Sequence, residues 1–334
     1  MVRQTASTVI LEILGGLILL IMVVAGLLAF RLASGPLPLG IFKDDIERAL
    51  TQARNGHAVR IGDVYLEWSR ADRRILVNAH DVQLYDDKND LSAEAARAEL
   101  VLSGSSLVLG KVEVLAMDLD QGWINVDQVT DTEWKIAGDP LPEIPAGQLP
   151  TTPAEWLARA NEVLPQLLVA LQQTEPTIDL ERASFDQFEV RVRGRDGASL
   201  LTLKAAKGQV ARRADGIALS VSGSGVGEGL PAGLAATLET SNSGQQLKAE
   251  FAVAKWPLAD LAIRFGMSSE RFEGLPANVV VSFDVSKAAG VEQIIVDVDA
   301  GAGRLPMGSN GVAVDDLKLK AAYAASTDTL SIDA

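Results

Sequence analysis

Apolar and polar residues alternate with a period of two along most of the chain after residue 64, and this pattern limits the fold more than any other feature. Successive side chains of a β-strand point to opposite faces of a sheet, so each segment can bury one face and leave the other to water. One-sided alternation is typical of antiparallel sheets, whereas parallel strands are apolar on both faces. The sequence therefore predicts a mainly β protein with a long, curved antiparallel sheet, a repeating β-groove, and a few short helices.

The predicted strands follow one another at fairly regular spacing. Before residue 138 they cover residues 64–68, 82–84, 96–102, 112–116 and 124–126. After residue 177 they cover residues 178–180, 188–193, 201–205, 217–223, 234–240, 247–253, 279–285, 294–300, 317–323 and 330–332. Turn sequences such as Asp196-Gly197 and Asp215-Gly216 separate them, and these residue types tolerate a positive φ. Successive strands are therefore expected to be hairpin neighbours.

Residues 13–30 form an uninterrupted apolar run of 18 residues without a charge or a hydrogen-bonding side chain. This run supplies almost all of the positive mean hydropathy of the chain, which is +0.17. As a helix it would span ~27 Å, close to the thickness of the hydrocarbon core of a bilayer. We therefore expect a transmembrane helix here. The residues expected to lie in the bilayer are Ile13, Leu17, Leu20, Val24, Leu28 and Phe30.

A cleaved signal peptide is the alternative interpretation of this run. Signal peptides have an apolar core of about 7–15 residues followed by a small-x-small cleavage site, and this run is longer. Arg31 also occupies a position where cleavage after Ala33 would need a small residue. An uncleaved anchor within residues 1–34 is therefore favoured.

The charge of the chain excludes some partners. Its 44 acidic and 30 basic residues give a net charge of -14, which speaks against nucleic acid because phosphate binding depends on Lys and Arg. No cysteine is present, so disulfides and thiolate chemistry are excluded. The few charges that flank the apolar run are too balanced to set its orientation. From the acidic body without a second apolar span we expect a single-pass protein of the inner membrane with a cytoplasmic N-terminus and a periplasmic bulk.

Composition divides the chain into four parts. Residues 1–34 are expected to be a cytoplasmic stub and the transmembrane anchor, and residues 35–137 a periplasmic β region with a short helix at 43–54. In that helix Ile46, Ala49, Leu50 and Ala53 share one face. Residues 138–175 are expected to be a linker, with four prolines between 138 and 152, and an amphipathic helix. Residues 176–334 are the predicted β-groove region, expected to continue beyond this chain.

The amphipathic helix has a clear predicted start. Thr152 is suited to the N-cap, Pro153 to the first helical position and Glu155 to a capping box. Pro165 predicts a kink. Its apolar stripe consists of Trp156, Leu157, Ala160, Val163, Leu164, Leu167, Leu168 and Leu171. We expect this stripe to pack on the sheet; contact with a membrane surface is the alternative, and it would favour Lys and Arg on the polar face, where only Arg159 stands.

Two further features concern the C-terminal part. Residues 257–266 predict a short helix between strands. The last predicted strand, 330–332, ends without a cap or a polar tail, which is typical of a strand that has a further neighbour. We therefore expect this chain to be the N-terminal piece of a longer repeating array or a truncated product, with a natural terminus on a paired strand as the alternative.

No catalytic, metal or cofactor site is predicted. His57 and His80 lack metal-ligand spacing, and the glycine-rich stretch 223–229 lacks the lysine and the helix of a phosphate loop. The carboxylate pairs Asp118/Asp120 and Asp297/Asp299 each share one face of a strand, where a solvated surface is the favoured interpretation. We expect a protein that is not an enzyme and needs no cofactor; a periplasmic hydrolase would require a site that the residues do not indicate.

Several stretches carry a resemblance to a known family. These are LPLGIFKDDIERAL (37–50), VYLEW (64–68), the long segment 77–119, FEGLPANVVVSFDV (272–285) and VDVDAGAGRLP (296–306). With the N-terminal apolar run, their order resembles the AsmA-like superfamily, most closely its YhdP-like branch, over nearly the whole chain. The resemblance implies proteins of Gram-negative bacteria that are anchored in the inner membrane and built from repeated β-groove units, thought to carry phospholipid toward the outer membrane. YhdP-like proteins are much longer than this chain.

A groove of this kind needs an apolar inner face. Aromatic residues make up only 5% of the chain, which favours an open or shallow groove over a filled core. The residues expected to line it are Leu201, Leu203, Leu219, Val221, Leu247, Phe251, Val279, Val281 and Phe283. The expected partners are the inner membrane through residues 13–30, phospholipid acyl chains and other envelope proteins. The alternative function is a non-catalytic scaffold that assists assembly of outer-membrane proteins.

Overall fold

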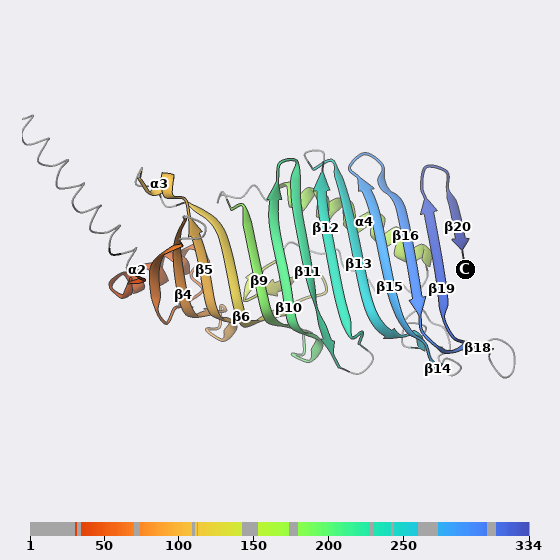
Figure 1. Cartoon of the computed structure of the whole chain (residues 1–334), viewed down its shortest axis with the longest axis horizontal. Coiled ribbons are helices and arrows are strands. Elements are labelled where there is room, and N and C mark those ends of the chain that lie inside the picture. The colour runs from red at the N-terminus through yellow and green to blue at the C-terminus, as the bar shows by residue number, and fades with distance from the viewer. Residues whose placement is uncertain are drawn as a thin grey trace, which may run out of the picture.

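The computed structural model describes residues 31, 35–69, 74–108, 111, 113–141, 153–173, 180–227, 230–241, 244–259, 273–305 and 312–333. The expected anchor at 13–30, most of the proline-rich linker at 138–152 and most of the predicted helix at 257–266 lie outside these residues. Among the described residues no helix is both long and apolar enough to cross a membrane. The described chain is mainly β, as predicted, and most strands belong to one long sheet (Figure 1).

The N-terminal half of the sheet is built from antiparallel neighbours. The order is β1 (Leu37–Pro38), β3 (Val64–Ser69), β4 (Arg74–Tyr85), β5 (Leu91–Leu102) and β6 (Val114–Gln128). Short strands extend this part at its ends: β2 (Val59–Arg60) pairs with β4, β7 (Trp134–Ile136) with β6, and β8 (Asp139–Pro140) with β7. The predicted strands before residue 138 therefore lie in this part of the sheet.

The C-terminal half is a meander of antiparallel strands. The order is β9 (Arg182–Arg193), β10 (Ser199–Arg213), β11 (Gly216–Val226), β12 (Gly233–Ser241), β13 (Gln246–Pro257), β15 (Pro276–Ser286), β16 (Gly290–Ala300), β19 (Leu317–Ala324) and β20 (Thr329–Asp333). A small separate sheet contains β14 (Glu273–Gly274), β17 (Gly303–Leu305) and β18 (Val312–Val314). Most strands of the meander are longer than the alternating segments that predicted them.

The two halves join through a parallel pair. β6 and β9 run in the same direction, with register from Ala116↔Arg182 to Asp127↔Arg193. The prediction of a wholly antiparallel sheet is therefore wrong at this pair, and the sheet is mixed. The physical reason is the long connection between β6 and β9, which includes a helix, because a parallel pair needs a long crossover that carries the chain from the end of β6 back to the end of the sheet where β6 began.

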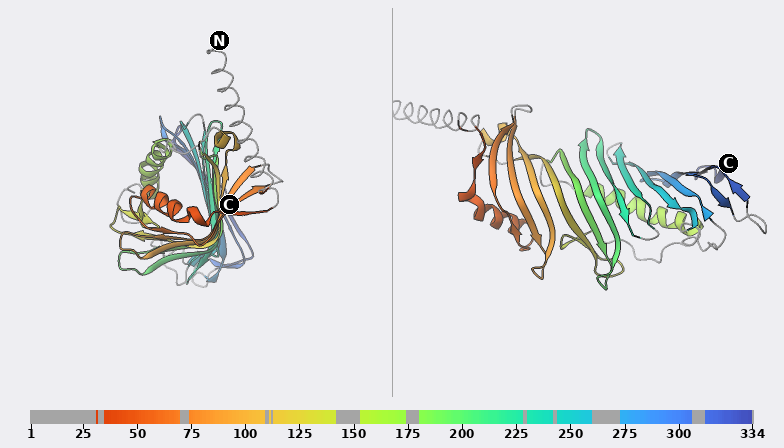
Figure 2. Two further views of the ribbon diagram at one scale, coloured as in Figure 1. Left: turned by 90° about the vertical axis from the view of Figure 1, so that its left-hand side faces the viewer. Right: turned by 60° about the horizontal axis from the view of Figure 1, so that its bottom comes forward.

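A row of residues with left-handed backbone conformation crosses the sheet. Five described strand residues have left-handed backbone conformations, with φ between 47° and 57°: Asp81, Gln121, Gln187, Ala205 and Lys255. The first four lie at one level across β4, β6, β9 and β10, where the register shifts or pauses. At Asp81, Gln121 and Gln187 the pairing resumes in the same register on both sides, whereas at Ala205 the register shifts by one residue, as in a β-bulge. The sheet as a whole is curved (Figure 2).

These left-handed residues interrupt the alternation that predicted the strands. At this level the apolar face steps by three residues along each strand, as from Ala79 to Val82 and from Phe185 to Phe188. In β5 this step turns Ala95 inward and leaves Ala96 exposed, so the expectation that Ala96 shares a face with Ala98 is wrong. A strict period of two does not hold at this level of the sheet.

The longer helices lie on the same side of the sheet, inside its bend (Figure 2). The short 3-10 helix η1 (Gly40–Phe42) leads into α2 (Lys43–Ala53), which confirms the helix predicted at 43–54. The other helices are α3 (Gly104–Val108) and α4 (Pro153–Gln173). α4 runs without interruption through Pro165, and the Thr152 cap lies outside the described residues.

α2 docks on the sheet mainly through polar groups. Ile46 packs on the apolar cluster around Val64, while a Glu47 carboxylate oxygen accepts a hydrogen bond from the Ile61 N–H at 2.7 Å. The Thr51 hydroxyl oxygen accepts another from the Val59 N–H at 3.1 Å. Leu50, with Ala49 and Ala53, is exposed. Of the predicted apolar face, Ile46 therefore contacts the sheet while the other three residues are exposed, because Glu47 and Thr51 turn toward two backbone N–H groups that require side-chain acceptors.

The end of α2 is fastened to the β7–β8 hairpin. Arg54 Nε lies 2.9 Å from Asp139 Oδ2, and Arg54 Nη2 donates to the Ala137 carbonyl at 2.6 Å. His57 Nδ1 lies 2.9 Å from the other Asp139 oxygen. These partly buried contacts join segments that are far apart in the sequence.

We predict that Asp139→Ala lowers the free energy of unfolding by about 1.5–3 kcal/mol, since it removes charge-assisted hydrogen bonds and leaves the partly buried Arg54 without its carboxylate partner. The matched control is Asp45→Ala, which removes an exposed ion pair between Asp45 and Arg48 and is expected to cost about 0.5 kcal/mol or less. Urea unfolding of the detergent-solubilised chain measures both. Equal effects of the two substitutions would contradict the fastening role.

Candidate functional site

The nine predicted groove residues lie on one face of the sheet. The register opposes Leu219 to Leu238, Leu238 to Ala249 and Ala249 to Phe283, which places these β11, β12, β13 and β15 residues on a common face. A second row contains Val221, Ala236, Phe251 and Val281. Leu247 and Val279 follow by alternation within their strands, and Leu201 and Leu203 join the face because Leu203 opposes Gly225. The structure thus brings all nine together on one surface.

This apolar face extends beyond the predicted residues. Toward the C-terminus it includes Ile294, Tyr323 and Leu330, which oppose one another across β16, β19 and β20. Toward the N-terminus the face continues across four strands. Its residues there are Val190 on β9, Ile124 on β6, Ala93 on β5 and Leu84 on β4. The face therefore crosses the parallel pair without a break and covers both halves of the sheet.

Burial differs along the face. Leu247 is fully buried at 1% exposure, whereas Phe251, four residues later on the same strand and face, is 40% exposed. The other seven predicted residues are half-buried. Within the part of the chain that the structure describes, side chains thus cover the apolar face at one end of β13 and leave it accessible further along.

α4 provides the cover at the buried end. Leu164 and Leu168 pack against Leu247, Ala249, Val285 and Val291, with Ala160, Leu238, Phe283 and Ile294 at the edge of this cluster. The Asn161 side-chain oxygen accepts a hydrogen bond from the Val291 N–H at 3.1 Å. The predicted packing of the helix stripe on the sheet is confirmed for Ala160, Leu164 and Leu168, while the side chains of Trp156, Leu157, Leu167 and Leu171 lie outside the description.

Two phenylalanines on β9 lie on the apolar face near the parallel pair of β6 and β9. The rings of Phe185 and Phe188 on β9 meet edge to face, with centroids 5.5 Å apart. A Cβ atom at Gly208 would overlap the Phe185 ring, and one at Gly122 would overlap the Glu94 carbonyl oxygen and approach Phe188. Sequence reasoning missed these residues. The signal was present in the three-residue spacing of the phenylalanines and in the glycines of the neighbouring alternating segments.

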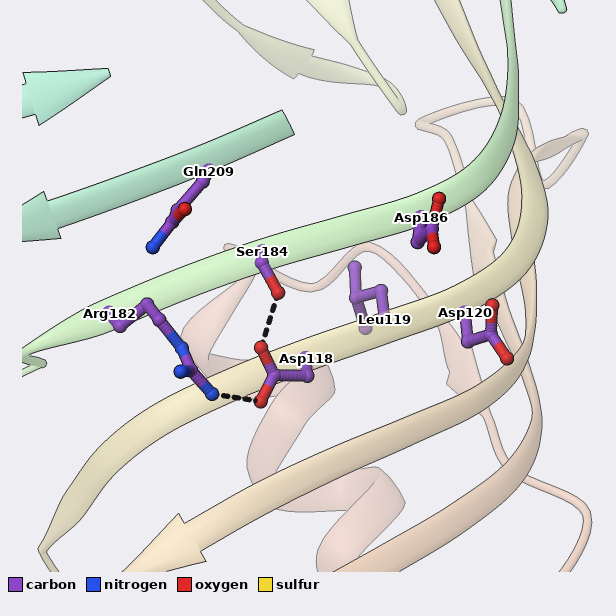
Figure 3. A pocket seen from close by; sticks show the side chains of 7 residues that line it. All are labelled: Asp118, Leu119, Asp120, Arg182, Ser184, Asp186 and Gln209. Carbon is purple, nitrogen blue, oxygen red and sulfur yellow. Dashed lines mark hydrogen bonds and ion pairs between the residues drawn. The ribbon is translucent and has the colours of Figure 1, made fainter. Parts of the chain in front are cut away.

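The opposite face of the sheet is polar. Asp118, Asp120 and Asp186 line a shallow depression of about 420 Å³ together with Leu119, Arg182, Ser184 and Gln209 (Figure 3). Asp118 accepts hydrogen bonds from Arg182 Nη2 at 2.7 Å and from the Ser184 hydroxyl, and Asp186 pairs with Lys207 at 3.2 Å. These partners join neighbouring strands. The arrangement fits the favoured interpretation of Asp118 and Asp120 as part of a solvated strand face.

Other charged groups on this face are also paired across strands. Arg193 donates to both carboxylate oxygens of Asp127 at 2.5 and 2.9 Å, and this hydrogen bonding raises the pKa of the Arg193 guanidinium above its ordinary value. Arg191 stacks over the Trp123 ring at 4.5 Å. The carboxylate pair at Asp297 and Asp299 includes an ion pair of Asp297 with Lys320 at 3.5 Å. These contacts join neighbouring strands on the polar face of the sheet.

The histidines occupy separate structural positions. His57 lies beside Asp139, as described above, and His80 packs edge-on against Tyr65 with centroids 5.9 Å apart. Over the described ranges, no group of three or more His, Cys, Asp or Glu side chains could hold a metal ion.

No family model matches the chain, and no curated protein or solved structure is similar to it.

Proposed function

We propose that this chain is an inner-membrane-anchored periplasmic protein whose apolar sheet face forms part of a hydrophobic groove for phospholipid transport toward the outer membrane. The observation that carries the proposal is the continuous apolar face, which runs across both halves of the sheet with Phe251 exposed and most of its other predicted lining residues half-buried. The apolar run at 13–30 supports the membrane anchor, and the resemblance to the YhdP-like branch of the AsmA-like superfamily supports the lipid cargo.

The physical basis is the transfer of acyl chains from water to the sheet. Transfer of each methylene out of water stabilises the bound lipid by about 0.8 kcal/mol, so a groove without catalytic groups can hold a lipid chain. The face consists largely of Leu, Val, Ile and Ala without ionised groups in the rows around Leu219 and Val221. Contacts of similar strength along the face would let an acyl chain slide, while the head group stays in water.

Charge placed on this face tests the proposal. Leu219→Asp puts a carboxylate among Val210, Leu238 and the acyl chain, and a charge in apolar surroundings is costly. We expect about a tenfold loss of crosslinking to a photoactivatable phospholipid, which corresponds to about 1.4 kcal/mol. The measurement is the crosslinked fraction of the full chain in membranes.

The matched control is Ser220→Asp, which places the same charge on the polar face of the same strand, opposite Gln209 and Thr237. Its crosslinking should equal that of the unmodified chain. Unchanged crosslinking in the Leu219 variant, or equal losses in both variants, would refute the groove assignment.

One observation favours the scaffold alternative. Leu330 and Ile332 on β20 are 63% and 61% exposed. Exposed apolar side chains of this size can contact another protein. Mass spectrometry of the purified chain separates the two functions, because a conduit copurifies with phospholipid and a scaffold copurifies with protein alone.

A further inference from the structure

Exposed apolar side chains gather where the described chain begins. Ile41 and Phe42 in η1 are 87% and 51% exposed, and Leu50 on α2 is 40% exposed. Ile41 is the most exposed large apolar side chain in the described part of the protein. Ile41 and Phe42 are adjacent in η1, and we call these two residues the N-terminal apolar patch.

α2 already contacts the sheet through other residues, so the exposure of the patch is not the result of a poorly packed helix. Ile46, Glu47 and Thr51 already make the contacts of this helix with β2 and the strands beside it. Leu39, next to η1, is also packed in the same apolar cluster. Turning Ile41 inward would break these contacts, so the fold leaves the patch available to a partner outside the described residues.

The position of the patch in the chain points to the partner. Ile41 follows the end of the 13–30 run by only 11 residues, which limits their separation to about 40 Å even for a fully extended chain. If residues 13–30 insert in a bilayer as proposed, the patch is tethered within reach of the surface of that bilayer. Apolar side chains beside an anchor are stabilised by insertion at the boundary between head groups and acyl chains.

We propose that the N-terminal apolar patch inserts into the bilayer surface beside the anchor and so holds the N-terminal end of the apolar sheet face against the membrane, where acyl chains enter it. Leu39 and Ile46 connect the patch to this end of the face through their cluster with Val64 and Leu84. The ion pair of Asp45 with Arg48 marks a side of α2 that stays in water. This inference rests on the proposed function and adds the place of lipid entry.

Single fluorescent labels test the insertion, because the chain contains no cysteine. Ile41→Cys and Phe42→Cys carry an environment-sensitive dye in the full chain, reconstituted in phosphatidylethanolamine and phosphatidylglycerol vesicles with or without spin-labelled lipid. We expect blue-shifted emission and quenching by the spin-labelled lipid at both positions. The matched control is Arg48→Cys on the exposed, polar side of α2, where neither effect is expected.

A label at Leu20→Cys reports insertion of the anchor in the same vesicles. Quenching at Leu20 together with equal signals at Ile41 and Arg48 would overturn the inference while leaving the anchor in place. A blue shift at Ile41 without lipid quenching would also overturn it, since a protein contact such as a second copy would then cover the patch.

Lipid loading tests the entry step separately. The double substitution Ile41→Ser and Phe42→Ser should slow photoactivatable phospholipid crosslinking by about threefold or more, because the apolar contact with the membrane is lost. Arg48→Ser is the control and should load at the unmodified rate. Normal loading by the double variant would refute the entry site, whereas an unmodified chain that never crosslinks to lipid would refute the proposed function itself.

Discussion

Gly122→Ala is expected to cause a large loss of stability, at least about 3 kcal/mol in the free energy of unfolding. Gly122 lies on β6 opposite Ala95, and a Cβ atom there would overlap the Glu94 carbonyl oxygen of the neighbouring strand. A backbone atom cannot rotate away as a side chain can, so β5 and β6 have to separate locally. Overpacking of an interior by a single carbon typically costs about 1–3 kcal/mol, and loss of strand pairing adds to it.

Urea unfolding followed by circular dichroism measures this effect on the full chain in detergent. Gly301→Ala is the control, because the nearest atom to its added Cβ lies at an ordinary 3.5 Å. Gly208→Ala gives an informative comparison. The three atoms nearest to its Cβ all belong to the ring of Phe185, so Phe185→Ala should rescue it, whereas Phe188→Ala should leave most of the Gly122 defect. A stable Gly122→Ala protein would show that the strands can shift to admit a methyl group.

The second large effect is expected at the contact of α4 with the sheet. Leu168 is completely buried at 0% exposure and packs beside Leu247. Leu168→Ala should lower the free energy of unfolding by about 2–5 kcal/mol, the range seen for truncation of buried leucines. Gln166→Ala, at an exposed position of the same helix, should change it by about 0.5 kcal/mol or less.

Hydrogen exchange distinguishes local release of α4 from global unfolding. In the Leu168 variant we expect faster exchange throughout α4 and at the Val291 N–H, whose acceptor is the Asn161 side chain. The amides of β4 and β5, far from this contact, should keep their protection. Unchanged exchange in α4 would show that Leu168 contributes little to holding the helix on the apolar face.

Much of the fold was predictable because local pattern determines local structure. Alternation located the strands of the meander, and the amphipathic segment at 43–54 located α2. Alternation also placed Leu219, Phe251 and Val281 on a common face, since residues of one parity in paired strands share a side of the sheet. The apolar face was therefore accessible from the sequence before its strand order was known.

Other features depend on contacts that no local pattern contains. The parallel register of Ala116 with Arg182 is set by the path of the chain between them, and hairpin signals carry no information about it. The outward turn of Leu50 follows from backbone N–H groups near β2 that Glu47 and Thr51 satisfy. The left-handed conformation of Gln187 left a trace in the three-residue spacing of Phe185 and Phe188, but the spacing alone does not show that the backbone changes conformation there.

The parallel pair of β6 and β9 also bears on how the chain folds. On each side of it, strands pair almost entirely with their neighbours in sequence, so both halves can assemble from hairpins with short loop closures. The pair itself joins residues more than 60 positions apart, such as Ala116 and Arg182, and its closure carries a larger entropic cost. The two halves can thus form independently during synthesis, and the apolar face becomes continuous only when the second half joins the first.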